Sequence, residues 1–331
     1  MLLPVRDGAA TLACALASIA RQSEGRFECV IVDDGSADES RAIAEHFAAR
    51  DERFRVIAAP REGLVAALNR GLAECRAPLV ARHDADDIMR RERLAKQCGA
   101  LDADASLAGV GCHVHLFPRR GITDGLRAYG AWLNSLASAA DVRRDAFVEC
   151  PLAHPTLVMR REALDALGGY RERDWPEDYD LVLRALASGR SLGVVAERLL
   201  AWRDGPARLS RTSTSYALAA FTACKAEFLA QGFLASHERY ALWGYGSTGR
   251  ALARALGAQG KRLGLVIELH PRRLGQRIHG AEVVPPAALR DPLARALPLV
   301  VSVAGAGPRA EIRSDLAALG YTDGRDFVCA A

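Results

Sequence analysis

The stretch Pro78-Leu79-Val80-Ala81-Arg82-His83-Asp84-Ala85-Asp86-Asp87 joins a short apolar run to three carboxylates within four residues. Its apolar part, residues 79–81, is typical of a buried parallel strand. In open α/β sheets, ligands bind beyond the carboxyl ends of the strands, where these carboxylates would lie. Carboxylates this close repel one another, and a hard cation such as Mg²⁺ or Mn²⁺, shared with substrate phosphates, relieves the repulsion. For Asp87 we favour a simpler role as N-cap of a helix over residues 88–101.

Strand and helix patterns alternate regularly before this stretch. Strands are predicted at residues 2–5, 28–32 and 54–57, and a helix pattern follows each of them. Ser36 with Glu39 three residues later matches a capping box, so we expect the second helix to begin at Ser36. Counting the strand at 79–81, strand and helix alternate four times. This predicts an α/β fold with a mostly parallel sheet and helices on both faces.

A second strand end is also acidic, in Asp33-Asp34-Gly35-Ser36. The residues allow two interpretations. One is a tight turn that leads into a helix. The other is a carboxylate directed at the base or ribose of a bound nucleotide. Two acidic strand ends in one parallel sheet face the same crevice, which favours the second interpretation.

A third acidic group occurs in Asp174-Trp175-Pro176-Glu177-Asp178-Tyr179-Asp180. Pro176 suits the first turn of a helix, and acidic residues there suit the helix macrodipole. That explanation is sufficient for Glu177 or Asp180 taken singly. A carboxylate at a helix start beside Trp175 is also well placed to act as a general base in a cleft.

A glycine-rich turn marks the C-terminal third of the chain. Gly244, Gly246 and Gly249 form a GxGxxG pattern between a strand at 240–243 and a helix pattern, the context in which that pattern binds dinucleotides. Glu268 ends the next strand, about 19 residues after Gly249, where a ribose-binding acid would lie. The glycines serve either a nucleotide ligand or only close packing of strand and helix, and the residues leave both open.

Length and composition limit the number of domains and the classes of partner. The chain has 331 residues and a net charge of +4, so about two domains are expected and nothing calls for a nucleic-acid partner. We expect a first domain at 1–215, a connecting helix at 216–238 and a Rossmann-like domain at 239–331. No apolar run approaches the roughly 20 residues that span a bilayer. The eight cysteines are scattered without a CxxC pair, which is typical of reduced thiols in a cytoplasmic protein.

Taken together, the motifs resemble the family-two glycosyltransferases with the GT-A fold. Residues 4–8 through 32–36 are similar to the nucleotide-binding half of that family. Residues 81–87 are similar to its metal-binding DxD segment. His154-Pro155-Thr156 through Gly168-Gly169-Tyr170-Arg171, together with residues 177–181, are similar to its acceptor half. The resemblance covers residues 1 to about 215 and implies a GT-A fold followed by a small Rossmann-like α/β domain.

The resemblance implies a donor pocket in the first half of this region. Asp33 would contact the nucleotide base, and Pro4 with Arg6 or Asp7 would line the same pocket.

The resemblance also implies roles for the later motifs. Asp84 would lie by the ribose or diphosphate, and Asp86, with Asp84, would bind Mg²⁺ or Mn²⁺. Asp178 would be the catalytic base, with Glu177 beside it on the acceptor side. Arg203 matches a basic position near the diphosphate.

The implied activity is metal-dependent, inverting transfer of a sugar from a nucleotide-sugar donor, with a UDP-sugar as first choice. The implied acceptor is a hydroxyl of a glycan or lipid-linked molecule in surface polysaccharide or glycolipid biosynthesis. The expected location is cytoplasmic, either free or peripheral at the inner face of the membrane. Two alternatives stay open: a nucleotide-sensing or scaffold protein, and an NAD-dependent oxidoreductase built on residues 244–249, with the ligand of that turn unidentified.

Overall fold

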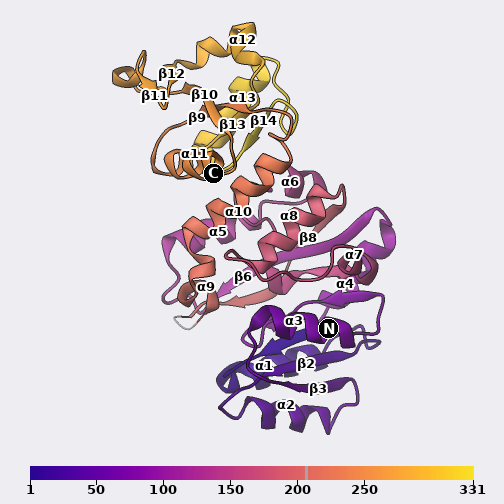
Figure 1. The fold of residues 1–331 in the computed structure, drawn as a ribbon. Coiled ribbons are helices and arrows are strands. Elements are labelled where there is room, and N and C mark those ends of the chain that lie inside the picture. Colours follow the sequence, from indigo (N-terminus) through magenta and orange to yellow (C-terminus); the bar gives the residue numbers. More distant parts are fainter. Residues whose placement is uncertain (206–207) are drawn as a thin grey trace. The chain divides into compact units, whose positions relative to one another are not determined.

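The computed structural model describes residues 1–205 and 208–331, which form two compact units (Figure 1). The N-terminal unit comprises Met1–Arg143, Pro151–Arg173 and Glu177–Thr212. The C-terminal unit comprises Ser213–Ala331 together with two short segments from the middle of the chain, Arg144–Cys150 and Asp174–Pro176. The predicted connecting helix at 216–238 therefore lies within the C-terminal unit.

The N-terminal unit begins with three parallel strands in the order β1-β2-β3. They are β1 (Leu2–Val5), β2 (Cys29–Asp34) and β3 (Phe54–Ala59). Strand β4 (Leu79–Ala81) continues past the other side of β1, where the N–H of His83 donates to the carbonyl of Leu2 at 3.1 Å. Because Leu2 and Arg82 form a parallel bridge, β1, β2 and β4 end at the same edge.

Beyond β4 the sheet is mixed. Its strand order is β4-β7-β6-β8-β5, with β7 (Val158–Arg160) and β5 (Ile88–Met89) antiparallel to their neighbours. The long strands β6 (Leu107–Phe117) and β8 (Ser191–Arg203) are parallel to each other. The parallel order expected from the alternating patterns thus holds for β1 to β4, whereas the later strands form both parallel and antiparallel pairs.

Helices cover both faces of the first strands, as predicted. Figure 1 shows α3 (Leu64–Glu74) on one face of β1–β3 and α2 (Ser40–Ala48) on the other. In α1 (Ala9–Ala20), Leu12, Leu16 and Ile19 are fully buried, because their spacing puts them on one side of the helix. The remaining helices of this unit are α4 (Arg93–Ala103), α5 (Asp124–Leu133), α6 (Ala139–Arg144, whose last residue belongs to the C-terminal unit), η1 (His154–Thr156), α7 (Arg161–Ala166), α8 (Glu177–Ala187) and α9 (Leu209–Thr212).

The predicted capping box at Ser36 is wrong. Helix α2 begins at Ser40, and Glu39 makes no side-chain capping hydrogen bond. The Ser36 hydroxyl instead accepts a hydrogen bond of 3.0 Å from the N–H of Asp7, in the loop after β1. A contact with a distant loop has therefore taken the place of the local capping bond.

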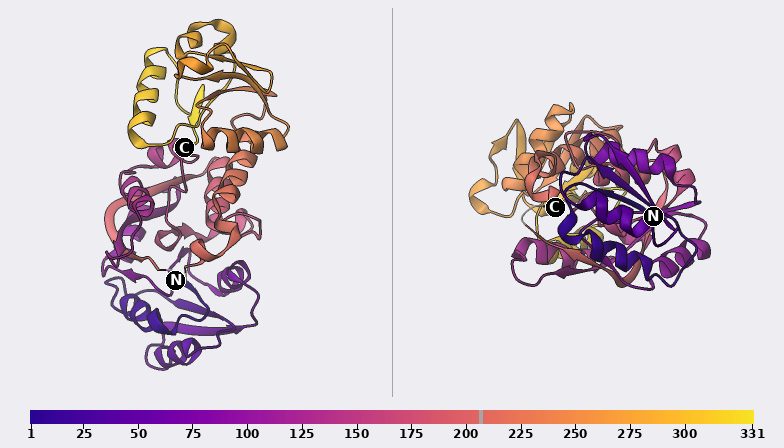
Figure 2. Two further views of the ribbon diagram at one scale, coloured as in Figure 1. Left: turned by 90° about the vertical axis from the view of Figure 1, so that its left-hand side faces the viewer. Right: turned by 90° about the horizontal axis from the view of Figure 1, so that it is seen from below.

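The C-terminal unit has a six-stranded sheet in the order β11-β12-β10-β9-β13-β14, parallel except for β11. Its five parallel strands follow the third-second-first-fourth-fifth order of the doubly wound fold. Figure 2 shows α13 along one side of this sheet. The strands are β9 (Arg239–Trp243), β10 (Arg262–Ile267), β11 (Arg277–Ile278), β12 (Ala281–Val284), β13 (Leu299–Val301) and β14 (Phe327–Cys329). The helices are η2 (Thr214–Tyr216), α10 (Leu218–Gln231), α11 (Ser247–Ala258), η3 (Pro271–Arg273), η4 (Pro286–Arg290), α12 (Pro292–Arg295) and α13 (Ala306–Ala318).

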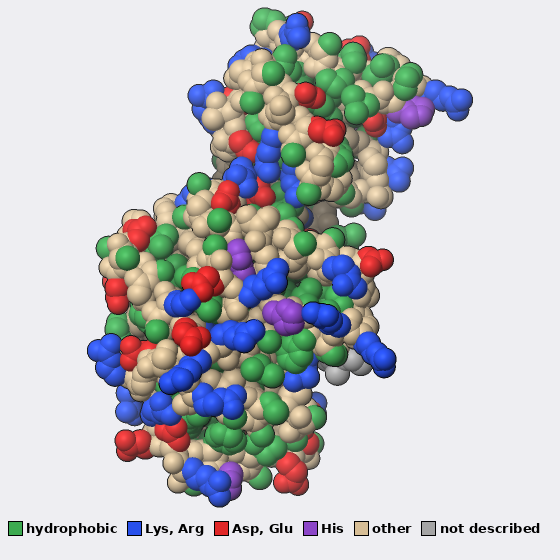
Figure 3. Space-filling model, turned by 180° about the vertical axis from the view of Figure 1, so that it is seen from behind, with side chains coloured by type: hydrophobic (Ala, Val, Ile, Leu, Met, Phe, Trp, Pro, Cys, Tyr) green, Lys and Arg blue, Asp and Glu red, His purple; other side chains and the backbone are tan. Residues whose placement is uncertain are grey.

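The surface mixes both charge signs. Figure 3 shows Lys and Arg side chains beside Asp and Glu side chains, with scattered hydrophobic ones between them, on the face it presents. In the described part of the chain, no helix combines the length and apolar character that a membrane crossing requires.

Candidate active site

Three carboxylates gather just after β4, as the acidic stretch predicts. Oxygen atoms of Asp84, Asp86 and Asp87 all lie within 4.8 Å of one another. Asp87 is buried, and the other two side chains are half-buried. The cluster lies beside the loop after β1, because a Cβ atom on Gly8 would be 3.6 Å from the Cβ atom of Ala85.

The three carboxylates differ in charge because Arg82 pairs with only one of them. Burial tends to raise the pKa of Asp84, but the ion pair with the Arg82 guanidinium outweighs it and lowers that pKa. Burial and the negative charge of Asp84 raise the pKa of Asp86 to about 6. Burial also raises the pKa of Asp87, and both neighbouring carboxylates add to the rise. Full ionisation of the cluster therefore requires additional positive charge.

The ligand set suits a hard divalent cation. All of its atoms are carboxylate oxygens, which Mg²⁺ and Mn²⁺ prefer. Within residues 1–205 and 208–331, the Oδ2 atom of Asp87 is buried without a hydrogen-bond partner, and such an atom calls for a ligand. The cluster could therefore hold a metal ion.

Asp87 does not cap a helix, so that prediction is wrong. Ile88 and Met89 form β5, and α4 begins only at Arg93. The Oδ1 atom of Asp87 accepts a hydrogen bond of 2.7 Å from the backbone N–H of Arg203, the last residue of β8. Antiparallel pairing of β5 with β8 brings these distant residues together, so the local sequence holds no sign of the contact.

A buried polar scaffold supports the acidic loop from α4. The guanidinium of Arg93 donates to the carbonyl of Arg82 at 2.9 Å, and its Nη1 atom lies 3.1 Å from Nδ1 of His83. Burial and the Arg93 charge lower the pKa of His83 to about 3, so this imidazole is neutral at pH 7. Gln97, one turn further along α4, accepts from Arg93 at 2.8 Å and donates to backbone carbonyls of β6 and η1. The scaffold thus holds the acidic loop and η1 together.

Two arginines near the end of β8 approach the cluster in different ways. The Nε atom of Arg203 donates to the backbone carbonyl of Asp86 at 2.7 Å, so this side chain anchors the loop. Arg208 stacks over the ring of Trp202 at 4.5 Å. Burial raises the pKa of Asp86, and the positive charge of Arg208 opposes that rise. Arg208 is therefore a cation of the site in addition to the predicted Arg203.

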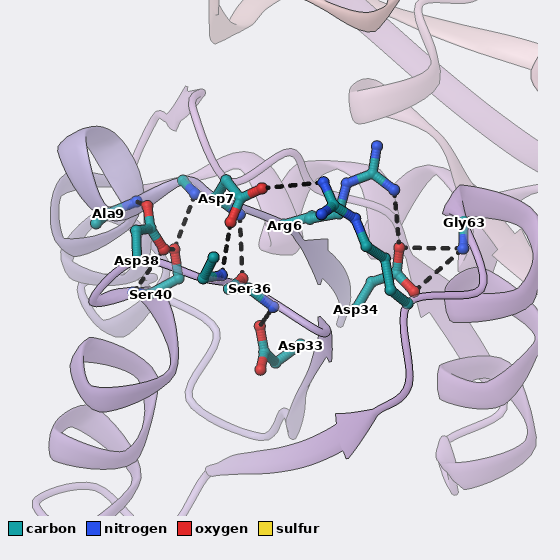
Figure 4. Close-up of polar contacts among 12 residues, drawn as sticks. Arg6, Asp7, Ala9, Asp33, Asp34, Ser36, Asp38, Ser40 and Gly63 are labelled. Atoms are coloured by element: carbon teal, nitrogen blue, oxygen red, sulfur yellow. Dashed lines mark hydrogen bonds and ion pairs between the residues drawn. The ribbon is translucent and has the colours of Figure 1, made fainter.

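On the nucleotide side, carboxylates tie the loops after β1, β2 and β3 together (Figure 4). Asp34 accepts hydrogen bonds from the backbone N–H groups of Glu62 and Gly63, just before α3. It also accepts from the Arg6 guanidinium at 3.4 Å. Asp7 accepts from a backbone N–H of the β2–α2 loop at 2.7 Å. Arg6 and Asp7 thus have structural partners, and their contact with a donor stays a prediction.

Asp33 and Asp34 are neighbours with different environments. Asp33 is buried, and its Oδ1 atom accepts from the N–H of Ser36 at 3.2 Å. In the described part of the chain its carboxylate has no other hydrogen bond, whereas that of Asp34 is saturated. Pro4 is buried one residue before Val5, which pairs with Asp33 at the carboxyl end of the sheet. Asp33 is therefore the better candidate of the acidic pair for contact with a nucleotide.

At the predicted acceptor side, Glu177 and Asp178 begin helix α8. The Oε1 atom of Glu177 lies 3.3 Å from Nδ1 of His154, whose Nε2 atom lies 3.1 Å from the Tyr170 hydroxyl. Asp178 is half-buried, and its Oδ1 atom accepts from the N–H of Tyr179 at 2.7 Å. Burial and the charge of Glu177 raise the pKa of Asp178 to about 6, so it is ionised at neutral pH yet basic for an aspartate.

Arg82 connects the two acidic groups. Burial alone would lower its pKa, but the charge of Asp84 and the hydrogen bond to it raise that pKa, with a smaller contribution from the charge of Glu177. The Arg82 charge also acts on Asp178, whose pKa it lowers against the larger effects of burial and Glu177. The predicted metal ligands and the predicted base therefore belong to one electrostatically connected site.

Apart from Arg203, sequence reasoning missed the basic residues of this site. Arg82 and His154 stand inside the quoted motifs, next to the acidic residues that received attention, and Arg208 follows the predicted Arg203 by five residues. The available signal was simple, because buried carboxylates need nearby positive charge. Which arginine or histidine supplies that charge depends on strand pairing between distant segments.

In the C-terminal unit, the glycine-rich turn connects β9 to α11, as predicted. A Cβ atom on Gly249 would lie 2.2 Å from the carbonyl oxygen of Gly244, whose own φ is +92°. Around Gly246 the space is open. The carboxylate of Glu268 accepts from Arg273 at 2.9 Å. Close packing therefore explains two of the glycines, and a ribose contact by Glu268 would require Arg273 to move.

Comparisons with known proteins show the family and the fold of this chain. The family model described as Glycosyl transferase family 2 matches residues 2–168. The amylovoran biosynthesis glycosyltransferase AmsE of Erwinia amylovora is 30% identical over 194 residues, covering 57% of this chain and 69% of AmsE. The glycosyltransferase EpsE of Bacillus subtilis is 30% identical over 224 residues, covering 65% of this chain and 77% of EpsE. The crystal structure of S. aureus TarS residues 1–349 with UDP-GlcNAc superposes with a TM-score of 0.56 at 17% identity, covering 77% of this chain and 70% of that one.

The fold and these likenesses define a glycosyltransferase with the GT-A fold. The chain belongs to glycosyl transferase family 2. The predicted resemblance and enzyme class are thereby confirmed. The family match ends at residue 168, before Ser213–Ala331, the main part of the C-terminal unit, so the Rossmann-like domain expected there stays a prediction that the strand order supports.

Proposed function

We propose that this enzyme transfers a glycosyl group from a nucleoside-diphosphate sugar to an acceptor hydroxyl, with inversion and with a divalent metal ion. A UDP-sugar is the first donor to test, because the fold is shared with TarS, which was crystallised with UDP-GlcNAc. The names of relatives support an acceptor in surface polysaccharide assembly. They include the amylovoran biosynthesis enzyme AmsE and the O-antigen biosynthesis glycosyltransferase WbnJ of Escherichia coli.

On the donor side, Asp33 contacts the base, and Asp84, Asp86 and Asp87 would hold Mg²⁺ or Mn²⁺. Such an ion, when bound, would supply positive charge against the diphosphate leaving group. Arg208, whose charge already acts on Asp86, adds a second positive group on the same side. Arg203 keeps the loop in place through its hydrogen bond to the carbonyl of Asp86.

On the acceptor side, Asp178 takes the proton from the attacking hydroxyl. A pKa of about 6 leaves it ionised at neutral pH while making it a stronger base than an ordinary aspartate. One base and one leaving group on opposite sides of the sugar suffice for a single displacement, which inverts the anomeric carbon. The acceptor is a glycan or lipid-linked hydroxyl compound, and peripheral association with the membrane would give access to the latter.

The observation that carries this proposal is the position of Arg82. It pairs directly with Asp84 and, from the same buried position, influences the pKa of Asp178. A purely structural acidic loop would not require a cation shared with a distant helix start. Donor and acceptor groups, in contrast, must meet at one reacting carbon.

The test is a screen of UDP-, GDP- and dTDP-sugars with and without Mn²⁺, by thermal shift and by release of the nucleoside diphosphate. We expect at least one donor to raise the melting temperature and to be turned over only with Mn²⁺ or Mg²⁺. Asp86→Ala should lose both effects. Binding of nucleotide without turnover of any donor, with or without acceptor extracts, would favour a sensing role instead.

Asp178→Asn separates the base from the donor site. We expect this variant to bind the donor with a Kd within about twofold of the wild type while transfer falls by roughly 10²–10⁴-fold, the range for loss of a general base. Asp102→Asn, on the exposed face of α4, is the matched control and should retain full activity. Full turnover by Asp178→Asn would remove Asp178 from the mechanism.

A further inference from the structure

A buried polar cluster stands behind the start of α8. His154 lies between two partners, with Nδ1 at 3.3 Å from Oε1 of Glu177 and Nε2 at 3.1 Å from the Tyr170 hydroxyl. All three residues are buried, with 5–6% exposure. Burial of a carboxylate and an imidazole is costly unless both are hydrogen-bonded. Nδ1 faces the Glu177 carboxylate at ion-pair distance and Nε2 lies within hydrogen-bond distance of the Tyr170 hydroxyl, so a proton on Nδ1 would be directed at the carboxylate.

Each partner is held by its own support, so the cluster is rigid. The η1 turn that carries His154 is fixed from α4 through Gln97, which donates to the carbonyl of Thr156 at 2.8 Å. Tyr170 is fixed through Asn69 of α3, whose side chain makes two backbone hydrogen bonds to it, both 2.9 Å. Glu177 is the first residue of α8. The imidazole therefore connects three elements at one point.

Stability alone is a poor reason for this arrangement. Apolar side chains of similar volume usually stabilise a buried position as well as an ion pair does. The cluster instead adjoins Asp178, the next residue after Glu177. Burial and the charge of Glu177 raise the pKa of Asp178, while His154 acts against that rise. Arg82 acts in the same direction as His154, so the titratable groups that face Asp178 are Glu177, His154 and Arg82.

We propose that His154 is a positioning residue for glycosyl transfer: its Nδ1–H holds the Glu177 carboxylate and thereby fixes the first turn of α8 and the direction of Asp178. This inference rests on the proposed function of Asp178. It assigns the contact through Nδ1 to catalysis and the contact through Nε2 to support of the imidazole ring.

Two amide substitutions separate these contacts. The amide nitrogen of Asn reaches the place of Nδ1, and that of Gln reaches the place of Nε2. His154→Asn therefore keeps a donor for Glu177, whereas His154→Gln keeps only the contact with Tyr170. With the donor found by the screen, we expect kcat to fall at least tenfold in His154→Gln and less than threefold in His154→Asn. The KM for the donor should stay within twofold in both variants, because the donor side is untouched.

The control is His115→Gln, at an exposed position of β6, which should leave kcat and KM unchanged. Equal losses in both His154 variants would show that only packing of the ring matters, and a His154→Gln enzyme with kcat within twofold of the wild type would also overturn the proposal. Far-UV circular dichroism checks that His154→Gln folds. If it does not fold, the kcat of His154→Asn decides, and a loss of more than tenfold in that variant would contradict the proposal.

A second measurement does not depend on activity. In ¹⁵N-histidine-labelled protein we expect a protected, downfield Nδ1–H resonance of His154 that disappears or moves upfield in Glu177→Gln. Absence of that resonance from the wild type would end the proposal, even for an active transferase. Its presence in a protein that turns over no donor would instead count against the proposed function alone.

Discussion

At the scale of single residues, the neighbouring carboxylates Asp33 and Asp34 illustrate how partners decide roles. Asp34 accepts from two backbone N–H groups and from Arg6, whereas among the described residues Asp33 accepts from the N–H of Ser36 alone. The saturated carboxylate holds the start of α3 in place. The other keeps acceptor capacity at the carboxyl edge of the sheet, where a donor nucleotide is proposed to bind.

This difference predicts opposite effects of two adjacent substitutions. Asp34→Ala should cost about 1–3 kcal/mol of unfolding free energy, because it takes their shared acceptor from the partly buried N–H groups of Glu62 and Gly63. Asp33→Ala should cost less than about 1 kcal/mol but weaken binding of the donor by roughly tenfold, the loss expected for one charge-assisted hydrogen bond. Urea denaturation and donor titration measure the two effects. Equal destabilisation by both variants would contradict the assignment.

Asp86 gives a prediction about pH. Its folded pKa of about 6 is above the unfolded value near 3.8, so the folded protein binds more protons between these values. The stability of the metal-free protein should therefore rise as the pH falls through 6, and decline as the pH rises through 6. Asp86→Asn should add about 1–3 kcal/mol at pH 7.5, because it removes a carboxylate whose ionisation is disfavoured.

Thermal melts of metal-free protein at pH 5 and pH 7.5 check this prediction. Mn²⁺ should raise the melting temperature of the wild type at pH 7.5 and not that of Asp86→Asn. The prediction is contradicted if metal-free Asp86→Asn is no more stable than metal-free wild type at pH 7.5. That result would show that the folded protein does not disfavour ionisation of Asp86.

At the scale of elements, helix α11 contains two glycines whose surroundings differ, Gly249 in its first turn and Gly257 in its last. A Cβ atom on Gly249 would lie 2.2 Å from a backbone oxygen, whereas one on Gly257, in the last turn of the same helix, would meet nothing within 4 Å. Gly249→Ala should therefore destabilise the C-terminal unit by about 2 kcal/mol or more, because backbone must shift. Gly257→Ala should stabilise it by about 0.5–1 kcal/mol through helix propensity. Calorimetry distinguishes the two, and tolerance of Gly249→Ala would mean that the turn is looser than described.

The sequence predicted elements better than it predicted contacts between them. Apolar spacing located β1 to β4 and the helices between them, since that pattern is local. The acidic motifs were placed at strand and helix ends for the same reason. In contrast, the helix starts proposed at Ser36 and after Asp87 were wrong, because each side chain has a partner far away in the chain: the N–H of Asp7 for Ser36 and that of Arg203 for Asp87.

The support of the site escaped prediction for a related reason. Arg93 and Gln97 read as ordinary polar positions of a helix, yet both are fully buried beneath the acidic loop. Their side chains donate hydrogen bonds to three backbone carbonyl groups, those of Arg82, Val110 and Thr156. These carbonyl groups come close to α4 only when the sheet has folded. A single sequence carries no record of which carbonyls will meet there.

At the scale of the whole molecule, the C-terminal unit includes a segment from the middle of the chain, residues 144–150. Asp145 of this segment accepts from Arg313 of α13 at 2.6 Å, and the carbonyl of Val148 accepts from the buried ammonium of Lys225 at 2.7 Å. The C-terminal unit is thus built from separate stretches of chain, so its folding depends on residues that precede much of the N-terminal unit.

This dependence predicts how the middle segment responds to a distant change. Arg313→Ala removes one ion-pair partner from the buried carboxylate of Asp145, so we expect a loss of about 2–4 kcal/mol in the C-terminal unit. Trypsin should then cleave at Arg143 or Arg144 at least tenfold faster than in the wild type, since local opening exposes the segment. Arg325→Ala, which removes an exposed pair with Asp326, is the matched control and should leave the cleavage rate unchanged. Equal cleavage of all three proteins would mean that residues 144–150 hold their place without α13.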